Sequence, residues 1–170
     1  CLWHRSVSDK LLYLNYTNAI TPDFVGDGTN ANETFSEDFH TDTTFGVGGA
    51  SSQINVSGGT YIACIFAHDT TDGGFIQCGS YAGNGSSTGP IATLGWEPQW
   101  VLVKKTSGTG NWYIFDAKRS TSNPRTSVLR ADLSNDEYTN ANNSIDFLST
   151  GFQLKNASGG FNSSGATYVY

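Results

Sequence analysis

The stretch "SGGTYIACIFA", from Ser57 to Ala67, returns near the C-terminus as "SGATYVY", from Ser164 to Tyr170. Both belong to a longer match, in which Thr43–Tyr61 aligns with Thr150–Tyr168 at a shift of 107 residues, without gaps and with nine identities in nineteen positions. Each copy is an apolar run of β-branched and aromatic residues behind a Ser-Gly turn, which is typical of a β-strand. The stretch therefore predicts a repeated β-domain.

The repeat continues upstream with a gradually larger shift, up to 114 residues. The further matches are Asp38-Phe39 with Asp146-Phe147, "TNAN" at Thr29–Asn32 with "TNAN" at Thr139–Asn142, and Arg5-Ser6 with Arg119-Ser120. Such drift is expected where turns differ in length while strands are kept. With a unit of about 107 to 114 residues, residues 1–67 are expected to be the C-terminal half of one unit. Residues 68–170 are then a nearly complete second unit that lacks the end of its last strand.

The composition favours strands joined by turns. The chain has 20 glycines, 13% aromatic residues and only 14% charged residues, which is poor material for long helices. We predict an all-β fold, an antiparallel β-sandwich or jelly roll. Pro90 and Pro98 bracket a segment that is expected to be a loop or an edge. The predicted strands are Lys10–Tyr16, Phe45–Val47, Thr60–Ala67, Gly74–Tyr81, Trp100–Lys105, Asn111–Asp116, Ser127–Leu133, Gly151–Leu154 and Thr167–Tyr170.

Several function classes are disfavoured. The net charge of −6 comes without a basic cluster, which argues against nucleic acid as a partner. No apolar stretch is long enough to span a membrane as a helix. The three histidines are isolated, and no P-loop or Gly-x-Ser-x-Gly motif is present. The best carboxylate pair for hydrolysis is Asp116 with Asp132 or Asp146, but we predict a protein that is not an enzyme and has no cofactor.

Two groups of acidic residues could bind calcium in turns, although their spacing favours solvated turns. They are Asp132, Asp136 and Glu137, and Asp23, Asp27 and Glu33. Among the cysteines, Cys64 and Cys78 either form a bridge between neighbouring strands or are two buried thiols.

The tryptophans allow a sugar-binding interpretation, because indole faces suit pyranose rings. We expect Trp100 and Trp112 to pack in the core. Trp96 lies in a Gly/Pro loop, where core packing and a glycan-binding role remain open. The glycan site would be completed by the loops around Asn84–Gly89 and Asn135–Asn143.

Seven Asn-x-Ser/Thr acceptors give candidate N-glycosylation sites: Asn15, Asn32, Asn55, Asn84, Asn142, Asn156 and Asn162. Asn32 matches Asn142 and Asn55 matches Asn162, so two acceptors recur at equivalent places. Either the surface carries glycans, or asparagine and serine are turn residues retained after a duplication.

Residues in the second unit resemble an uncharacterised tandem domain of structural and fibre proteins of marine tailed phages and related environmental sequences. The matching motifs are a "W-V/I-hydrophobic-V-K" strand at Trp100–Lys104, a "W-x-V/I-aromatic-D" strand at Trp112–Asp116, an Arg-Ser turn at Arg119-Ser120, and a closing "N-x-S-G-x-T-Y-V" strand at Asn162–Val169. Arg5-Ser6 and Asn55–Ile62 echo the last two. The resemblance implies a lectin-like β-sandwich and a role in a particle or fibre.

We therefore expect a structural subunit of an extracellular or virion fibre that associates with itself by strand sharing at open sheet edges. The candidate edge residues are Tyr61, Ile62, Thr167, Tyr168, Val169 and Tyr170. The alternative is a glycan-binding adhesin with Trp96 at its site, whose partners would be cell-surface glycans.

Overall fold

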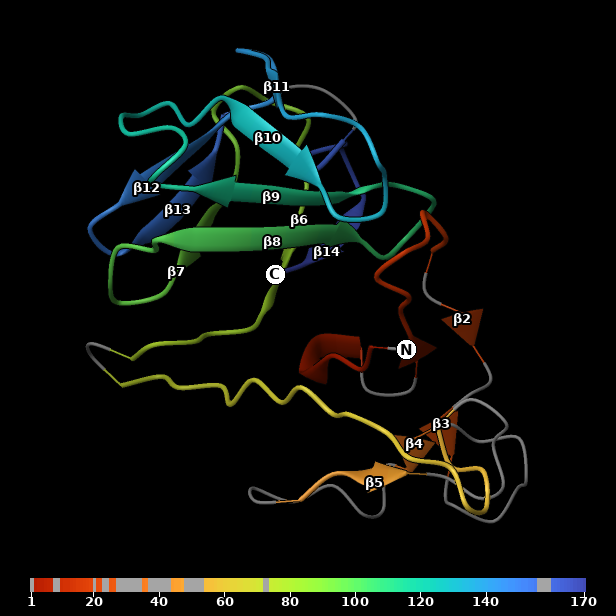
Figure 1. The fold of residues 1–170 in the computed structure, drawn as a ribbon. Coiled ribbons are helices and arrows are strands. Elements are labelled where there is room, and N and C mark those ends of the chain that lie inside the picture. Colours follow the sequence, from red (N-terminus) through yellow and green to blue (C-terminus); the bar gives the residue numbers. More distant parts are fainter. Residues whose placement is uncertain are drawn as a thin grey trace. The chain divides into compact units, whose positions relative to one another are not determined.

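The computed structural model describes residues 2–7, 10–19, 21–22, 25–26, 35–36, 44–47, 54–71, 74–155 and 160–170 (Figure 1). Its contacts divide the chain into two compact units. The first comprises residues 1–12 and 20–66, and the second comprises residues 13–19 and 67–170. The segment Tyr13–Ala19 therefore packs with the second unit, although it lies within the N-terminal part of the sequence.

The first unit contains a single-turn 3-10 helix, η1 (Arg5–Val7), and short strands. An antiparallel pair and a three-stranded sheet of order β3-β4-β5 are described, with β3 and β4 parallel and β4 and β5 antiparallel. Their bounds are β1 (Lys10–Leu11), β2 (Thr21–Pro22), β3 (Val25–Gly26), β4 (Phe35–Ser36) and β5 (Gly46–Val47). Leu12, only 1% exposed, is the buried anchor beside β1, where it forms a bridge with Leu2.

The second unit is built on a six-stranded antiparallel sheet of order β11-β10-β9-β8-β14-β6. Its strands are β6 (Ser80–Ala82), β8 (Trp100–Lys105), β9 (Trp112–Asp116), β10 (Ser127–Arg130), β11 (Tyr138–Thr139) and β14 (Thr167–Val169). A second antiparallel sheet has the order β12-β13-β7, with β7 (Ile91–Thr93), β12 (Ile145–Leu148) and β13 (Gly151–Leu154).

The core of the second unit draws side chains from both sheets. One set comes from β8, β9, β10 and β14, and the other from β7, β12 and β13. The fully buried large residues of this core are Phe115, Phe152, Phe161, Tyr168, Ile145, Leu154, Val103 and Val128. Side chains of alternating strand residues that meet between two antiparallel sheets define a β-sandwich, so the predicted fold class is confirmed.

A β-hairpin formed by β8 and β9 lies at the centre of the large sheet (Figure 1). Tyr113 and Phe115 belong to the core, so alternation places Trp112 and Asp116 on the opposite face. The segment Tyr13–Ala19 covers Trp112 there, because the indole Nε1 donates to Tyr13 O at 2.9 Å.

Most predicted strands of the second unit are present, several of them shorter than expected. β8 and β13 have the predicted bounds. Between the two prolines, where a loop or an edge was expected, β7 is an edge strand. β11 and β12 were not predicted. In the first unit, only Lys10–Leu11 of the predicted Lys10–Tyr16 is a strand, because Tyr13–Ala19 packs on the second unit instead.

Candidate functional site

The strand β14, which carries the second copy of the repeated phrase, lies between two other strands. Tyr168 pairs with Lys105 of β8 on one side and with Tyr81 of β6 on the other. The exchange of hydrogen bonds with β6 continues to Tyr170, whose N and O bond to Gly79 at 2.9 and 3.0 Å. The expected open edge at Thr167–Tyr170 is therefore wrong: β6 comes from the first half of the same unit and closes it.

The turn before β14 is held by Asn162, which is fully buried. Its Nδ2 donates to Asn84 Oδ1 at 3.1 Å and to Ser86 O at 2.9 Å, while its Oδ1 accepts from Asn84 N at 2.9 Å. Asn162 thus joins the end of the unit to the loop that follows β6. From the sequence, Asn162 was interpreted as a glycan acceptor, and this structural role was therefore missed. The recurrence of asparagine at Asn55 and Asn162 was the signal that could have indicated it.

The first copy of the phrase forms the same turn. Val56 N donates to Tyr61 Oη at 2.9 Å, and 107 residues later Ser163 N donates to Tyr168 Oη at 2.9 Å. The glycine between them has a positive φ in both copies, 78° at Gly58 and 73° at Gly165. Backbone bonds from Gly59 to Val56 and from Ala166 to Ser163 complete the equivalence. The local sequence therefore encodes this turn without help from neighbouring strands.

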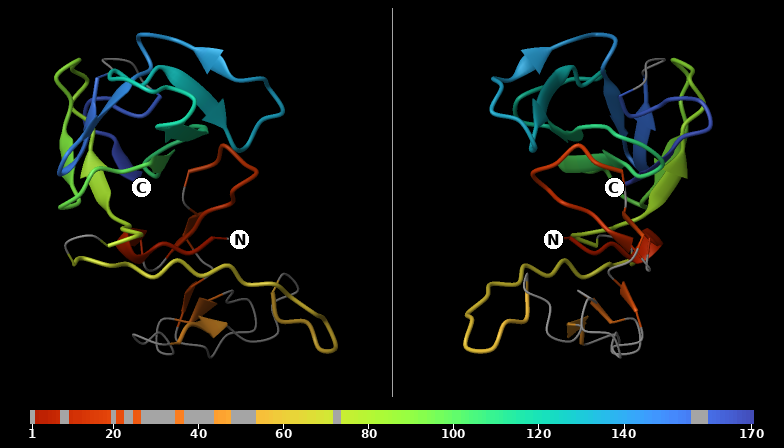
Figure 2. Two further views of the ribbon diagram at one scale, coloured as in Figure 1. Left: turned by 60° about the vertical axis from the view of Figure 1, so that its left-hand side comes forward. Right: turned by 90° about the vertical axis from the view of Figure 1, so that its right-hand side faces the viewer.

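The strand predicted at Thr60–Ala67 is nevertheless not formed. Figures 1 and 2 draw this segment as an extended yellow to olive trace without an arrow. Tyr61 is 49% exposed and Ile62 is 96% exposed, whereas their counterparts Tyr168 and Val169 are 0% and 2% exposed. Ile65 and Phe66 are exposed as well. The prediction was wrong because a strand needs a partner, and none pairs with this segment among the described residues.

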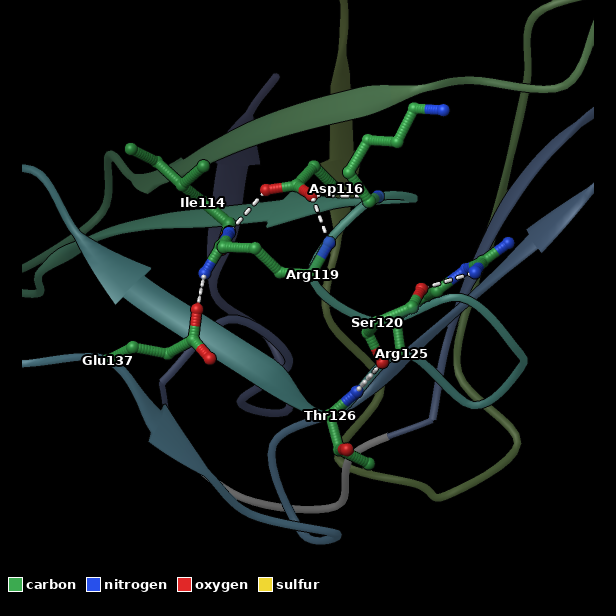
Figure 3. A network of polar contacts seen from close by, with 8 residues as sticks. Ile114, Asp116, Arg119, Ser120, Arg125, Thr126 and Glu137 are labelled. Carbon is green, nitrogen blue, oxygen red and sulfur yellow. Dashed lines mark hydrogen bonds and ion pairs between the residues drawn. The ribbon is translucent and has the colours of Figure 1, made fainter.

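The carboxylate of Asp116, part of the best candidate catalytic pair, is engaged by Arg119 (Figure 3). It accepts from Arg119 Nε and from the backbone N of Arg119 at 2.8 Å and Lys118 at 2.9 Å. Partial burial alone would raise the pKa of Asp116, but these hydrogen bonds and the guanidinium charge outweigh it, so the pKa is lowered.

Arg119 also links two further elements. Its Nη1 donates to Glu137 Oε2 at 2.7 Å beside β11, and its Nη2 donates to Ile114 O at 3.2 Å in β9. Arg125 is the second basic residue of this region, and its Nη1 donates to Ser120 O (Figure 3). Its guanidinium carbon lies 5.1 Å from the ring centroid of Phe147. The Arg-Ser turn therefore ties the large sheet together by charge-assisted hydrogen bonds.

The other two carboxylates of the candidate pairs have separate structural partners. Asp132 Oδ1 accepts from Trp112 N at 2.9 Å, and Asp146 lies 3.7 Å from Lys155 Nζ. Among the residues that the structure describes, no group of three His, Cys, Asp or Glu side chains could hold a metal ion. His40, Asp23, Asp27 and Glu33 lie outside the described residues.

Lys104 is a buried cation on the face that Tyr13–Ala19 covers. Its Nζ donates to Thr17 O at 3.0 Å and to Gly110 O at 2.7 Å, and the side chain is 0% exposed. Burial lowers the pKa of Lys104 to about 8, although the charge of Asp132 partly opposes this shift. The lysine fastens the N-terminal segment to the β8–β9 hairpin.

Trp100 and Trp112 were expected to pack in the core between the sheets, and neither does. Trp100 is 55% exposed, so its predicted core position is wrong. Trp112 is buried, but on the outer face beneath Tyr13–Ala19. Trp96 is partly buried and packs against the core, as in the first of its two open interpretations. The loop expected beside it is fastened by Asn84, whose Nδ2 donates to Thr88 O at 3.0 Å.

The glycosylation candidates fall into three groups. Asn162 is buried with its Nδ2 donating twice, so it is excluded as an acceptor in the folded unit. Asn32 and Asn156 lie outside the described residues. The exposed candidates are Asn15, Asn55, Asn84 and Asn142. Cys64 carries an exposed free thiol, so neither the Cys64–Cys78 bridge nor a buried Cys64 is present.

A family model described as a domain of unknown function, DUF7483, matches residues 1–170. No curated protein and no solved structure matches the chain. Within the part of the chain that the structure describes, no helix has the length and apolar character needed to cross a membrane.

Proposed function

Because the chain belongs to the DUF7483 family of domains of unknown function, we propose a function from its own structure: it is a non-enzymatic structural β-domain that associates with copies of itself through shared strands. Its setting is an extracellular or virion fibre, as in the proteins whose repeats it resembles. No cofactor is part of this proposal.

One observation carries the proposal. The segment Thr60–Phe66 holds an apolar strand sequence in extended form, with Ile62 96% and Phe66 66% exposed. Its counterpart β14 is paired on both sides. Exposed apolar segments with unsatisfied backbone groups are the features by which strand addition joins protein chains.

The carboxylates support a structural rather than a catalytic role. Asp116, Asp132 and Asp146 each bond to a different neighbour within the sandwich, and the first is held ionised by Arg119. General acid catalysis by a carboxyl group needs a raised pKa, the opposite of the shift at Asp116.

The proposal is tested by sedimentation velocity of the purified chain over a hundredfold range of concentration. We expect association that Ile62→Asp abolishes, because a charge in a shared strand would be buried. Leu14→Asp is the matched control, because Leu14 is also exposed, at 46%, but lies in a turn outside the segment. A chain that stays monomeric throughout contradicts self-association. An Ile62→Asp variant that associates like the unaltered chain contradicts association through this segment.

A further inference from the structure

We infer that the segment Asn55–Ala67 is a binding site for a second copy of the repeat's first half, residues 68–114, in which no closing strand lies between the β6-type and β8-type strands, and that the segment inserts between those two strands. The inference rests on the proposed function and names the partner: two specified strands of the same domain. The bound state is seen once in this chain, where Asn162–Tyr170 lies against β6 and β8.

The segment is preformed for this arrangement. Gly58 and Tyr61 already hold the turn that Gly165 and Tyr168 hold in the second unit, with the same hydroxyl-to-backbone bond of 2.9 Å. A preformed turn loses less conformational entropy when its strand is paired. What differs between the copies is the surrounding strands, since Tyr168 is buried between β6 and β8 while Tyr61 is half exposed.

The backbone hydrogen bonds of β14 in the second unit identify the equivalent groups in Asn55–Ala67, which lie 107 residues earlier in the sequence. Gly83 N donates to Ala166 O at 2.8 Å, and Gly85 N donates to Asn162 O at 2.9 Å. On the other side, Thr106 N donates to Thr167 O at 2.9 Å. The equivalent acceptors in the first copy are the carbonyl oxygens of Gly59, Asn55 and Thr60. Bonds on both sides would satisfy a segment whose apolar side chains now face solvent.

The side chains of Asn55 and Ile62 are also equivalent to side chains of the closing strand. Asn55 is exposed and takes the place of Asn162, whose amide bonds to Asn84 and Ser86. A β6 copy would therefore meet Asn55 with the same loop. Ile62 takes the place of Val169, which is 2% exposed between β6 and β8. The partner is thus specified by polar contacts as well as by apolar burial.

The chain's own β6 and β8 are not available to this segment, because β14 occupies the position between them. The fit there is also close. A Cβ added at Gly83 would lie 2.3 Å from Ser163 O, and one added at Gly89 would lie 2.9 Å from Asn162 Nδ2. The glycine-rich sequence after β6 is therefore shaped for a closing phrase of this kind, and a second copy of it is the partner that fits Asn55–Ala67.

The test is a chain that carries an additional copy of residues 68–114 directly before Cys1. Because Arg5-Ser6 matches Arg119-Ser120 at a shift of 114 residues, Cys1 corresponds to position 115 of the second unit. Ile114 of the added copy therefore directly precedes Cys1, with the spacing of a complete unit. Hydrogen exchange is followed at the amides of Tyr61–Ala67, and alkylation is followed at the exposed Cys64 thiol. We expect both to slow by at least about 100-fold relative to the unextended chain. The matched control carries Gly83→Val in the added copy alone, which should restore fast exchange.

Unchanged exchange at Tyr61–Ala67 in a folded extended chain overturns the inference, as does equal protection by the Gly83→Val extension. If the extended chain does not fold, a synthetic peptide of residues 79–88 is added to the unaltered chain at millimolar concentration. Slower exchange at Tyr61–Phe66 then supports the inference, and unchanged exchange overturns it.

The two proposals fail differently. If the unaltered chain stays monomeric in sedimentation but the extended chain protects the segment, association between molecules fails and the strand-binding site stands. If the unaltered chain associates while Tyr61–Ala67 still exchanges fast in the folded extended chain, the binding site fails and another surface mediates association.

Discussion

The rings of Tyr81 and Tyr168 stack across the β6–β14 pair, with centroids 5.1 Å apart and planes inclined by 13°. They come from the first and last parts of the second unit, and Tyr81 Oη also donates to Phe161 O at 2.7 Å. Burial raises the pKa of Tyr81, and the nearby Tyr168 raises it further, so the hydroxyl stays protonated as a donor. This pair joins the glycine-rich loop to the closing strand.

Replacing Tyr81 should weaken that closure. Tyr81→Ala removes the stacked ring and should lower the free energy of unfolding by about 3 kcal/mol. Tyr81→Phe keeps the ring and loses only the bond to Phe161 O, so it should cost about 1 kcal/mol. Urea denaturation measures both. Equal costs for the two variants would mean that the stack contributes nothing.

Two glycines should respond differently to alanine. At Gly165 only the positive φ opposes a side chain, since nothing lies within 4 Å of an added Cβ, and Gly165→Ala should cost about 1 kcal/mol. At Gly83 the added Cβ would lie 2.3 Å from a backbone oxygen, so β6 and β14 must separate. The Tm of Gly83→Ala, measured by thermal unfolding, should lie well below that of Gly165→Ala. The reverse order would contradict the close approach of Gly83 to the backbone oxygen.

Lys104 should give the protein a pH dependence in the alkaline range. Its pKa is about 8 in the folded state and 10.5 in the unfolded state, so the folded state loses its proton first and stability rises between these values. Solvent screening should limit the rise to about 1–2 kcal/mol. Urea denaturation from pH 7 to 10 should show the rise, and Lys104→Met, which cannot titrate, should abolish it.

Above about pH 10 the trend should reverse. Burial raises the pKa of Tyr113 and of Tyr81 in the folded state, so the unfolded chain loses these protons first and stability falls. A profile that declines steadily from pH 8 in the unaltered chain would contradict the position assigned to Lys104.

Expression in a glycosylating host should leave Asn162 unmodified, because its amide is buried and donates to Asn84 and Ser86. Intact-peptide mass spectrometry measures the occupancy. Glycans, if added, should be found at exposed acceptors such as Asn15 and Asn142. A glycan on Asn162 in folded protein would contradict the buried pair. Asn162→Asp should destabilise the unit, since a carboxylate would face two acceptor oxygens.

The strands that could be predicted from the sequence are those in which apolar residues alternate along the strand itself. β8 and β13 have their predicted bounds because Val101, Val103, Phe152 and Leu154 all point to the core. Trp100 was misplaced because its size suggested burial, although alternation with Val101 puts it on the outer face.

Other features depend on contacts distant in the sequence. The bonds of Lys104 to Thr17 and of Asn162 to Asn84 span 87 and 78 residues, and no local pattern encodes either. The difference between Thr60–Ala67 and β14 is of the same kind. The two phrases are alike and form the same turn, so the neighbouring strands decide which of them becomes a strand.

The most direct test of strand sharing is electron microscopy of the native assembly, at a resolution that separates the strands beside Tyr61–Phe66. The account predicts a strand on each side of this segment, with a Ser80–Ser86 sequence that is not paired with a β14 of its own facing Asn55 and Tyr61. An assembly in which Tyr61–Phe66 remains exposed to solvent, with subunits joined elsewhere, would contradict it.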